Sequence, residues 1–210
     1  MHVAIAIMAG GAGRRMGRDK ALLELEGKPL LERIAEAALE TGRDVVVIGR
    51  ERPPGWNRDD IRFIPDDMPG AGPLAGIATA LRHLRVPVLA LACDLPLVTA
   101  TSIRWLLDEA CRAGAVDGLV TLNNGRPEPL FAAYFPSALP HAEMLLASNR
   151  RALRDLLASG TFATVDAPPE IIAALVNVNT PHEWGEVKSQ NSKVKSGEEA
   201  RRRSGDSAAS

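Results

Sequence analysis

Residues 3–20 read VAIAIMAGGAGRRMGRDK, and this stretch decides the fold. Its first part, Val3–Met8, is apolar throughout, as expected of a strand buried on both faces of a parallel sheet. Glycines and cations fill the loop after it: Gly10, Gly11, Gly13, Gly17, Arg14, Arg15, Arg18 and Lys20. Glycine lets backbone N–H groups approach an anion with no Cβ in the way. The stretch therefore predicts a phosphate-binding loop on a nucleotide-binding sheet.

Two better-known phosphate-binding loops do not fit this stretch. A P-loop requires Ser or Thr directly after its lysine, whereas Lys20 precedes Ala21 and lies three residues beyond Gly17. The dinucleotide fingerprint G-x-G-x-x-G also fails, because Gly11 and Gly13 are followed by Gly17, one residue too late. A flexible glycine-rich turn with solvated arginines is the alternative interpretation.

Hydrophobic periodicity, interrupted by Gly and Pro, predicts alternating strands and helices along the chain. The predicted strands are Val3–Met8, Val45–Ile48, Ile61–Ile64, Val86–Cys93, Asp117–Leu122, Pro129–Phe135 and Thr161–Val165. The predicted helices are Leu30–Glu40, Leu74–Leu84, Thr101–Arg112, Ser137–Ala147 and Arg151–Ala158. We expect Thr101 or Ser102 to cap the third of these helices.

The length of 210 residues predicts one domain, residues 1–187, followed by a polar tail, residues 188–210, that we expect to be disordered. No apolar run reaches the roughly 18 residues that a membrane helix needs. The N-terminus also lacks the basic segment of a signal peptide, so we expect a cytoplasmic protein without membrane contact. Cys93 and Cys111 are too few for a disulfide framework and are expected to pack as small hydrophobes.

The net charge of −1 is unevenly distributed. Residues 188–210 hold six of the 25 basic side chains and three of the 26 acidic ones, which leaves residues 1–187 with a net charge of −4. A mildly acidic domain is a poor nucleic-acid binder, so no nucleic-acid partner is expected. A polyphosphate would have to be held by local cations and a metal ion.

A second informative loop, residues 66–76, reads DDMPGAGPLAG. Pro73 suits the first position of a helix, whose free N–H groups and positive dipole end would face a ligand above the sheet. Gly72 allows close approach, and the carboxylates of Asp66 and Asp67 are acceptors that a ribose or a base edge could use. A rigid turn with an ordinary helix cap is the alternative.

Asp94 follows the predicted strand Val86–Cys93, which is apolar throughout and so expected at the centre of the sheet. Open α/β sheets bind ligands at the carboxyl ends of such strands. Mg²⁺ prefers one or two carboxylates together with phosphate oxygens and water, which one aspartate above a phosphate-binding loop provides. The alternative is that Asp94 caps the next turn.

Two later stretches carry polar side chains of interest. Arg150 lies in an arginine pair that is either a cationic site or a solvated helix end. Asn177 and Asn179 would point to one side of an extended segment, where their amides could read a polar heterocycle or serve turn chemistry.

The stretch MAGGAGRRMGRDK, with an apolar residue, A-G-G, R-M-G and a later lysine, resembles the nucleotidyltransferase signature. G-P-L-A-G at Gly72–Gly76, C-D-L-P at Cys93–Pro96 and V-N-V-N-T-P at Val176–Pro181 narrow the resemblance to the molybdenum cofactor guanylyltransferases. It spans residue 1 to about residue 187. The related cytidylyltransferases usually carry A-A-G at Ala9–Gly11, so the A-G-G of this chain favours guanine.

This resemblance implies an α/β fold with three layers, α/β/α, around a Rossmann-like, mainly parallel seven-stranded sheet of the nucleotide-diphospho-sugar transferase type. It implies GTP as substrate, Mg²⁺ as cofactor and transfer of GMP to the terminal phosphate of molybdopterin. Molybdopterin-insertion or molybdoenzyme maturation proteins are possible partners on the same grounds.

Positions that match the family motifs take over the family's roles. Catalytic roles are implied for Arg15, Lys20 and Asp94, with Asp94 also the metal ligand. Nucleotide contacts are implied for Met8, Ala9, Gly10, Gly11, Lys20, Asp66, Gly72, Pro73, Leu74 and Asp94. Contacts on the pterin side are implied for Arg150, Asn177 and Asn179.

Two departures from the family pattern are visible. Met8 replaces the usual leucine, and Ile48-Gly49-Arg50 stands where members can carry an asparagine, which puts a nucleotide contact from that strand in doubt. Two other functions compete with the guanylyltransferase: a nucleotidyltransferase with another base or acceptor, and a non-catalytic GTP-binding accessory protein. A dinucleotide-dependent oxidoreductase ranks last because its fingerprint is off by one residue.

Overall fold

The computed structural model describes residues 1–10 and 19–176. Seven strands form one sheet in the order β5-β4-β1-β6-β8-β7-β9. Their bounds are β1 Ala4–Met8, β4 Val45–Ile48, β5 Arg62–Ile64, β6 Val88–Ala92, β7 Gly118–Asn123, β8 Arg126–Tyr134 and β9 Phe162–Asp166. All neighbouring pairs are parallel except those of β8, which runs antiparallel to β6 and β7. The short strands β2, Glu24–Leu25, and β3, Lys28–Pro29, form a separate hairpin.

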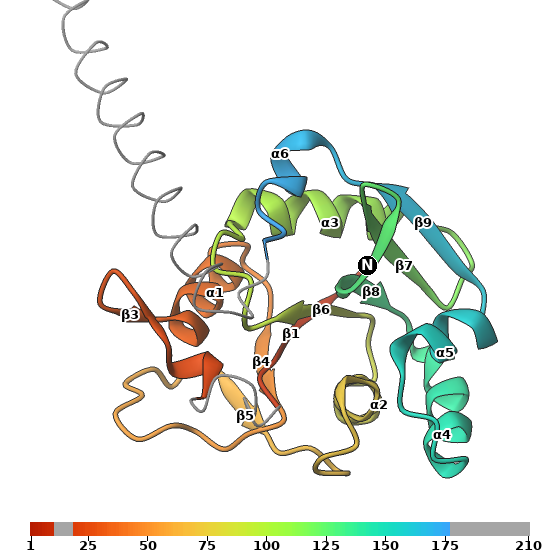
Figure 1. Cartoon of the computed structure of the whole chain (residues 1–210), viewed down its shortest axis with the longest axis horizontal. Helices are drawn as coiled ribbons and strands as arrows, with labels where there is room; N and C mark the ends of the chain where they lie inside the picture. The colour runs from red at the N-terminus through yellow and green to blue at the C-terminus, as the bar shows by residue number, and fades with distance from the viewer. Residues whose placement is uncertain (11–18, 177–210) are drawn as a thin grey trace, which may run out of the picture.

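Helices cover both faces of the sheet, which makes the three layers visible in Figure 1. On one side lie α1, Leu30–Leu39, α3, Ala100–Arg112, and the short α6, Pro169–Ile172. On the other lie α2, Pro73–Leu84, α4, Leu139–Ala147, and α5, Leu153–Ser159. Two 3₁₀ turns, η1 at Lys20–Leu22 and η2 at Pro136–Ala138, complete the elements of the described residues.

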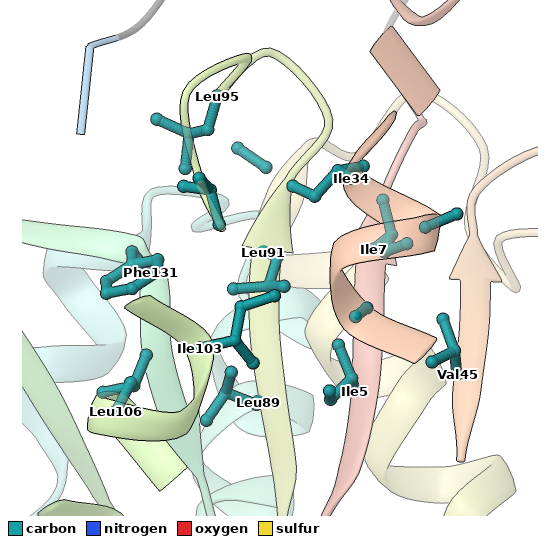
Figure 2. Close-up of a cluster of buried hydrophobic side chains, with 14 of the residues drawn as sticks. Ile5, Ile7, Ile34, Val45, Leu89, Leu91, Leu95, Ile103, Leu106 and Phe131 are labelled. Carbon is teal, nitrogen blue, oxygen red and sulfur yellow. The ribbon is translucent and has the colours of Figure 1, made fainter. Parts of the chain in front are cut away.

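The alternation of side chains along β1 divides the core between the two faces. Ile5 and Ile7 pack toward α1 and α3, where Figure 2 shows them beside Ile34, Leu91 and Ile103. Ala6 and Met8 point the other way, into the cluster under α2, α4 and α5. All residues of β1 are buried, because helices cover the strand on both sides.

The α/β fold, its three layers and its seven mainly parallel strands are confirmed. Several predicted bounds are wrong. β8 begins at Arg126 instead of Pro129, because the turn before it consists of Asn124 and Gly125 alone. The first turn predicted for α4 is the 3₁₀ turn η2, α5 begins at Leu153, and α6 was not predicted.

The predicted cap of α3 is also wrong. Thr99 is the N-cap: its hydroxyl accepts a hydrogen bond from the backbone N–H of Ser102, and the Ser102 hydroxyl accepts one in return from the backbone N–H of Thr99. Such a reciprocal pair satisfies two backbone donors at the start of the helix.

Only one of the two cysteines packs as expected. Cys93 lies against the core, and burial raises the pKa of its thiol to about 12. Cys111, in contrast, is exposed on α3. In the described residues no helix has the length and apolar character needed to cross a membrane.

Candidate active site

A cavity of about 260 Å³ opens at the carboxyl ends of β1, β4 and β6. The chain leaves β1 for α1 on one face of the sheet, whereas β5 is followed by α2 on the other (Figure 1). The cavity lies above the central strands, where these two directions diverge. Such a switch in direction is where open α/β sheets bind ligands. The lining residues are Met8, Ala9, Gly10, Asp19, Lys20, Ala21, Ile48, Gly49, Asp66, Gly72, Pro73, Gly76, Ala92, Cys93, Asp94 and Leu130.

Eight of the predicted site residues meet in this cavity: Met8, Ala9, Gly10, Lys20, Asp66, Gly72, Pro73 and Asp94. Leu74 does not line it, because its side chain is completely buried between α2 and the sheet. Arg150 lies on the surface, where its guanidinium pairs with Asp155 at 3.0 Å. Gly11, Arg15, Asn177 and Asn179 lie outside the described residues.

The floor of the cavity depends on a close approach of two glycines. Gly49, at the end of β4, has φ +92°, and a Cβ built on it would lie 2.5 Å from Cα of Gly10 and 2.7 Å from its nitrogen. The same contact is tight from the other side, since a Cβ on Gly10 would lie 2.9 Å from Cα of Gly49. Neither position therefore has room for a side chain. Gly49 was not predicted as a site residue.

We expect the replacement Gly49→Ala to lower the free energy of unfolding by about 3 kcal/mol. Alanine would have to keep the left-handed backbone conformation of Gly49, and its Cβ would also clash with the backbone of Gly10. Gly42→Ala is the matched control, because Gly42 has φ +72° but no atom within 4 Å of an added Cβ. It should lose only about 1 kcal/mol. Urea denaturation measures both losses, and equal values would contradict a specific role for the Gly10–Gly49 contact.

The charged residues of the cavity form a connected chain. Lys20 Nζ lies 3.1 Å from Oδ2 of Asp94, and both side chains are 20% exposed. Asp19 begins the turn that carries Lys20: its carboxylate accepts a hydrogen bond from the backbone N–H of Ala21 and pairs with Arg50 at 3.0 Å. Arg50, just after β4, thus anchors the turn that presents Lys20 to Asp94. Asp19 was not predicted as a lining residue, although it adjoins Lys20 in the opening stretch.

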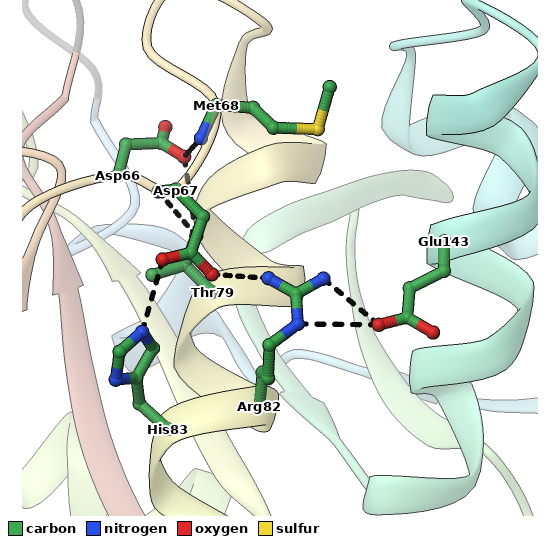
Figure 3. Close-up of polar contacts among 7 residues, drawn as sticks. All are labelled: Asp66, Asp67, Met68, Thr79, Arg82, His83 and Glu143. Atoms are coloured by element: carbon green, nitrogen blue, oxygen red, sulfur yellow. Dashed lines mark hydrogen bonds and ion pairs between the residues drawn. The ribbon is translucent and has the colours of Figure 1, made fainter.

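The two aspartates of the second loop have different surroundings. Asp66 lines the cavity, and its Oδ1 accepts hydrogen bonds from the backbone N–H of Met68 at 3.1 Å and from the hydroxyl of Thr79 at 3.2 Å. Asp67 turns away to Arg82 and His83, so its expected role as an acceptor for substrate is wrong (Figure 3). Burial alone would raise the pKa of Asp67, but the hydrogen bonds from His83 and Arg82 hold it below its usual value.

Leu130 reaches the cavity through an irregular strand pair. The register of β7 against β8 jumps between Val120, opposite Ala132, and Thr121, opposite Glu128. The extra residues of β8 bulge from the ladder, and Leu130 lies among them against the cavity. Pro129, one of these extra residues, is the sequence signal that could have indicated the bulge, because proline within a sheet is confined to edge strands, strand starts and bulges.

The described side chains do not enclose a metal ion by themselves. Among residues 1–10 and 19–176, no three His, Cys, Asp or Glu side chains gather as ligands. Asp94 offers one carboxylate, which lies beside Lys20 just after the carboxyl end of β6. A single carboxylate suits a cation that takes its other ligands from phosphate oxygens and water, as Mg²⁺ does.

These features define an α/β protein with a cavity at the switch point of its sheet, lined in part by charged side chains. Residues 5–166 match the model of the MobA-like NTP transferase domain, and the chain belongs to this family.

Relatives and solved structures agree with this assignment. A probable molybdenum cofactor guanylyltransferase of Methanothermobacter thermautotrophicus is 37% identical over 162 residues, which cover 74% of this chain and 82% of the relative. One of Deinococcus radiodurans is 40% identical over 154 residues, with 71% and 76% covered. The crystal structure of molybdopterin-guanine dinucleotide biosynthesis protein A from Archaeoglobus fulgidus superposes with a TM-score of 0.78 at 28% identity, covering 90% of this chain and 99% of that one.

Proposed function

We propose that this protein transfers GMP from GTP to the terminal phosphate of molybdopterin, which yields the guanine dinucleotide cofactor and pyrophosphate. The observation that carries the proposal is the meeting of Lys20 and Asp94 with the backbone of Gly10 in one cavity. Relatives named molybdenum cofactor guanylyltransferase support guanine as the base and molybdopterin as the acceptor.

The polar groups of the cavity fit a nucleoside triphosphate. The cation of Lys20 and the backbone around Gly10 suit its phosphates. Gly11 and Arg15 of the same loop are proposed as further phosphate contacts because they match the family motif. Gly72 and Pro73 place the positive end of α2 at the cavity wall, while Asp66 offers an acceptor to the ribose or the base. Leu74 can contribute only backbone atoms, because its side chain is buried.

Asp94 is the residue that would hold Mg²⁺, with phosphate oxygens of GTP and water as the remaining ligands. When bound, the ion supplies positive charge against the oxygens of the triphosphate. Lys20, whose Nζ lies 3.1 Å from Oδ2 of Asp94, adds a positive charge to the same part of the cavity. Lys20 and the cation that Asp94 would hold thus supply positive charge to stabilise the negative charge that develops on the leaving pyrophosphate.

No general base is needed for this reaction. The attacking group is a phosphate monoester, whose second pKa of about 6 leaves it largely dianionic at neutral pH. None of the described histidines, His2, His83 and His141, lines the cavity. Catalysis then consists of holding two anions together and stabilising the charge that develops.

The acceptor side is proposed from sequence motifs, with Arg150, Asn177 and Asn179 as contacts to the pterin. Molybdopterin-insertion or molybdoenzyme maturation proteins are the proposed partners, on the family resemblance alone. We propose the cytoplasm as the compartment.

The test is pyrophosphate release from GTP and, separately, from CTP, with Mg²⁺ and molybdopterin present. We expect release with GTP only, and none when molybdopterin is omitted. Release with CTP instead would assign a cytidylyltransferase. GTP binding without any release would assign a nucleotide-binding accessory protein.

A further inference from the structure

Thr79 is a buried polar residue on α2 that belongs to no family motif noted above. Its side chain is 1% exposed, and only two other described polar residues, Ser102 and Thr121, are buried to a similar degree. The Thr79 hydroxyl donates a hydrogen bond to Oδ1 of Asp66 and accepts one from the backbone N–H of Asp67, both at 3.2 Å. Figure 3 shows these residues side by side at the start of the loop. The single hydroxyl thus binds two consecutive residues of that loop.

These contacts use one oxygen of the Asp66 carboxylate, Oδ1, and do not involve the other, Oδ2. Oδ1 accepts from both the Thr79 hydroxyl and the Met68 backbone N–H, which fixes the rotation of the carboxylate. Oδ2 has no hydrogen-bond partner within residues 1–10 and 19–176, and Asp66 lines the cavity. A fixed carboxylate with one oxygen free is an acceptor prepared for a donor on a ligand.

The outer side of the loop is held by surface charges. Asp67 pairs with Arg82 and, at 3.1 Å, with His83, while Arg82 reaches Glu143 of α4 at 2.9 Å (Figure 3). These side chains are between 31% and 48% exposed, and exposed ion pairs contribute little to stability. The buried hydroxyl of Thr79 is therefore the side-chain contact expected to orient Asp66, together with the backbone N–H of Met68.

We propose that Thr79 is a positioning residue of the nucleotide site, which acts through Asp66 and raises the affinity for GTP. The donor that Asp66 Oδ2 binds is either a ribose hydroxyl or an N–H group of guanine, two sources of the same hydrogen-bonding chemistry. This inference rests on the proposed function, since it takes GTP as the ligand of the cavity.

The test compares Thr79→Val, which keeps the side-chain shape but removes the hydroxyl, with Thr79→Ser, which keeps the hydroxyl. Calorimetric titration gives the Kd for GTP, and steady-state kinetics gives KM and kcat. We expect Thr79→Val to raise Kd and KM about tenfold, which equals about 1.4 kcal/mol, with kcat within about twofold. Thr79→Ser should stay within about threefold of the unaltered protein. Thr79→Ala replaces the valine variant if that variant does not fold.

Thr121→Val is the matched control. Thr121 is also completely buried, and its hydroxyl meets no hydrogen-bond partner in the described part of the chain. This variant should leave the Kd for GTP unchanged. A comparable rise in Kd for Thr121→Val would overturn the specific role of Thr79.

Two further measurements separate the possible outcomes. In an Asp66→Ala background, Thr79→Val should add no further loss of affinity, and an additional tenfold loss would show that Thr79 does not act through Asp66. Affinity for 2′-deoxy-GTP, which lacks a ribose hydroxyl, and for ITP, which lacks the amino group of guanine, identifies the donor. The analogue that lacks the group bound by Asp66 should bind equally well to Thr79→Val and to the unaltered protein. An unchanged Kd for GTP in Thr79→Val would overturn the inference alone, whereas an unaltered protein that binds no GTP would overturn the proposed function as well.

Discussion

Replacement of Asp94 with alanine is expected to reduce pyrophosphate release from GTP at least about 10³-fold, because it removes the carboxylate proposed to hold Mg²⁺ and several kcal/mol of charge stabilisation with it. The fold should persist. Asp94 and Lys20 are both 20% exposed and line the cavity, so water that enters the cavity can solvate the Lys20 ammonium once its partner is removed. Circular dichroism and thermal unfolding check that the variant is folded.

Calorimetric titration of Mg²⁺ in the presence of GTP tests the metal assignment independently of turnover. The Asp94→Ala variant should lose the dependence of GTP binding on Mg²⁺. Asp44→Ala is the control, since Asp44 is exposed beside His2 and far from the cavity lining. Near-normal turnover with Mg²⁺ in the Asp94 variant would exclude Asp94 as the metal ligand.

Replacement of Lys20 with alanine is expected to cost at least about 3 kcal/mol of transition-state stabilisation, or more than about 100-fold in kcat/KM. The reason is that Lys20 is a preorganised cation, which the Asp19–Arg50 ion pair and the 3₁₀ turn hold against the cavity. Lys28→Ala is the control, because Nζ of Lys28 pairs with Glu36 at 2.7 Å outside the cavity.

The division between kcat and KM assigns the role of Lys20. A fall in kcat places its charge at the reacting phosphates, as proposed. A weaker affinity for GTP with unaltered kcat would instead restrict Lys20 to binding. Because Lys20 and Asp94 contact each other, the double variant should show less than the sum of the two single losses.

Local patterns in the sequence determined the fold and the main elements of the candidate site. Val3–Met8 and the strand before Asp94 are apolar throughout because helices cover them on both sides, and this covering leaves a readable pattern. Pro73 marks the start of α2 because its fixed φ suits the first helical turn. Apolar strand patterns and helix starts depend only on residues that are close together in the chain, so they can be predicted from the sequence.

The tertiary structure decided which distant groups meet. Gly49 contacts Gly10 only because β4 pairs with β1, and Leu130 reaches the cavity only through the bulge in β8. Asp66 and Asp67 are adjacent in sequence, yet one faces the cavity while the other pairs with Arg82 and His83. The sequence presents these two carboxylates as equivalent. What distinguishes them is the direction of each side chain relative to α2, the helix that follows the loop and carries Thr79, Arg82 and His83. Strand pairing, the side chain that a bulge turns toward the cavity, and side-chain direction arise from long-range packing, and so only the folded chain defines them.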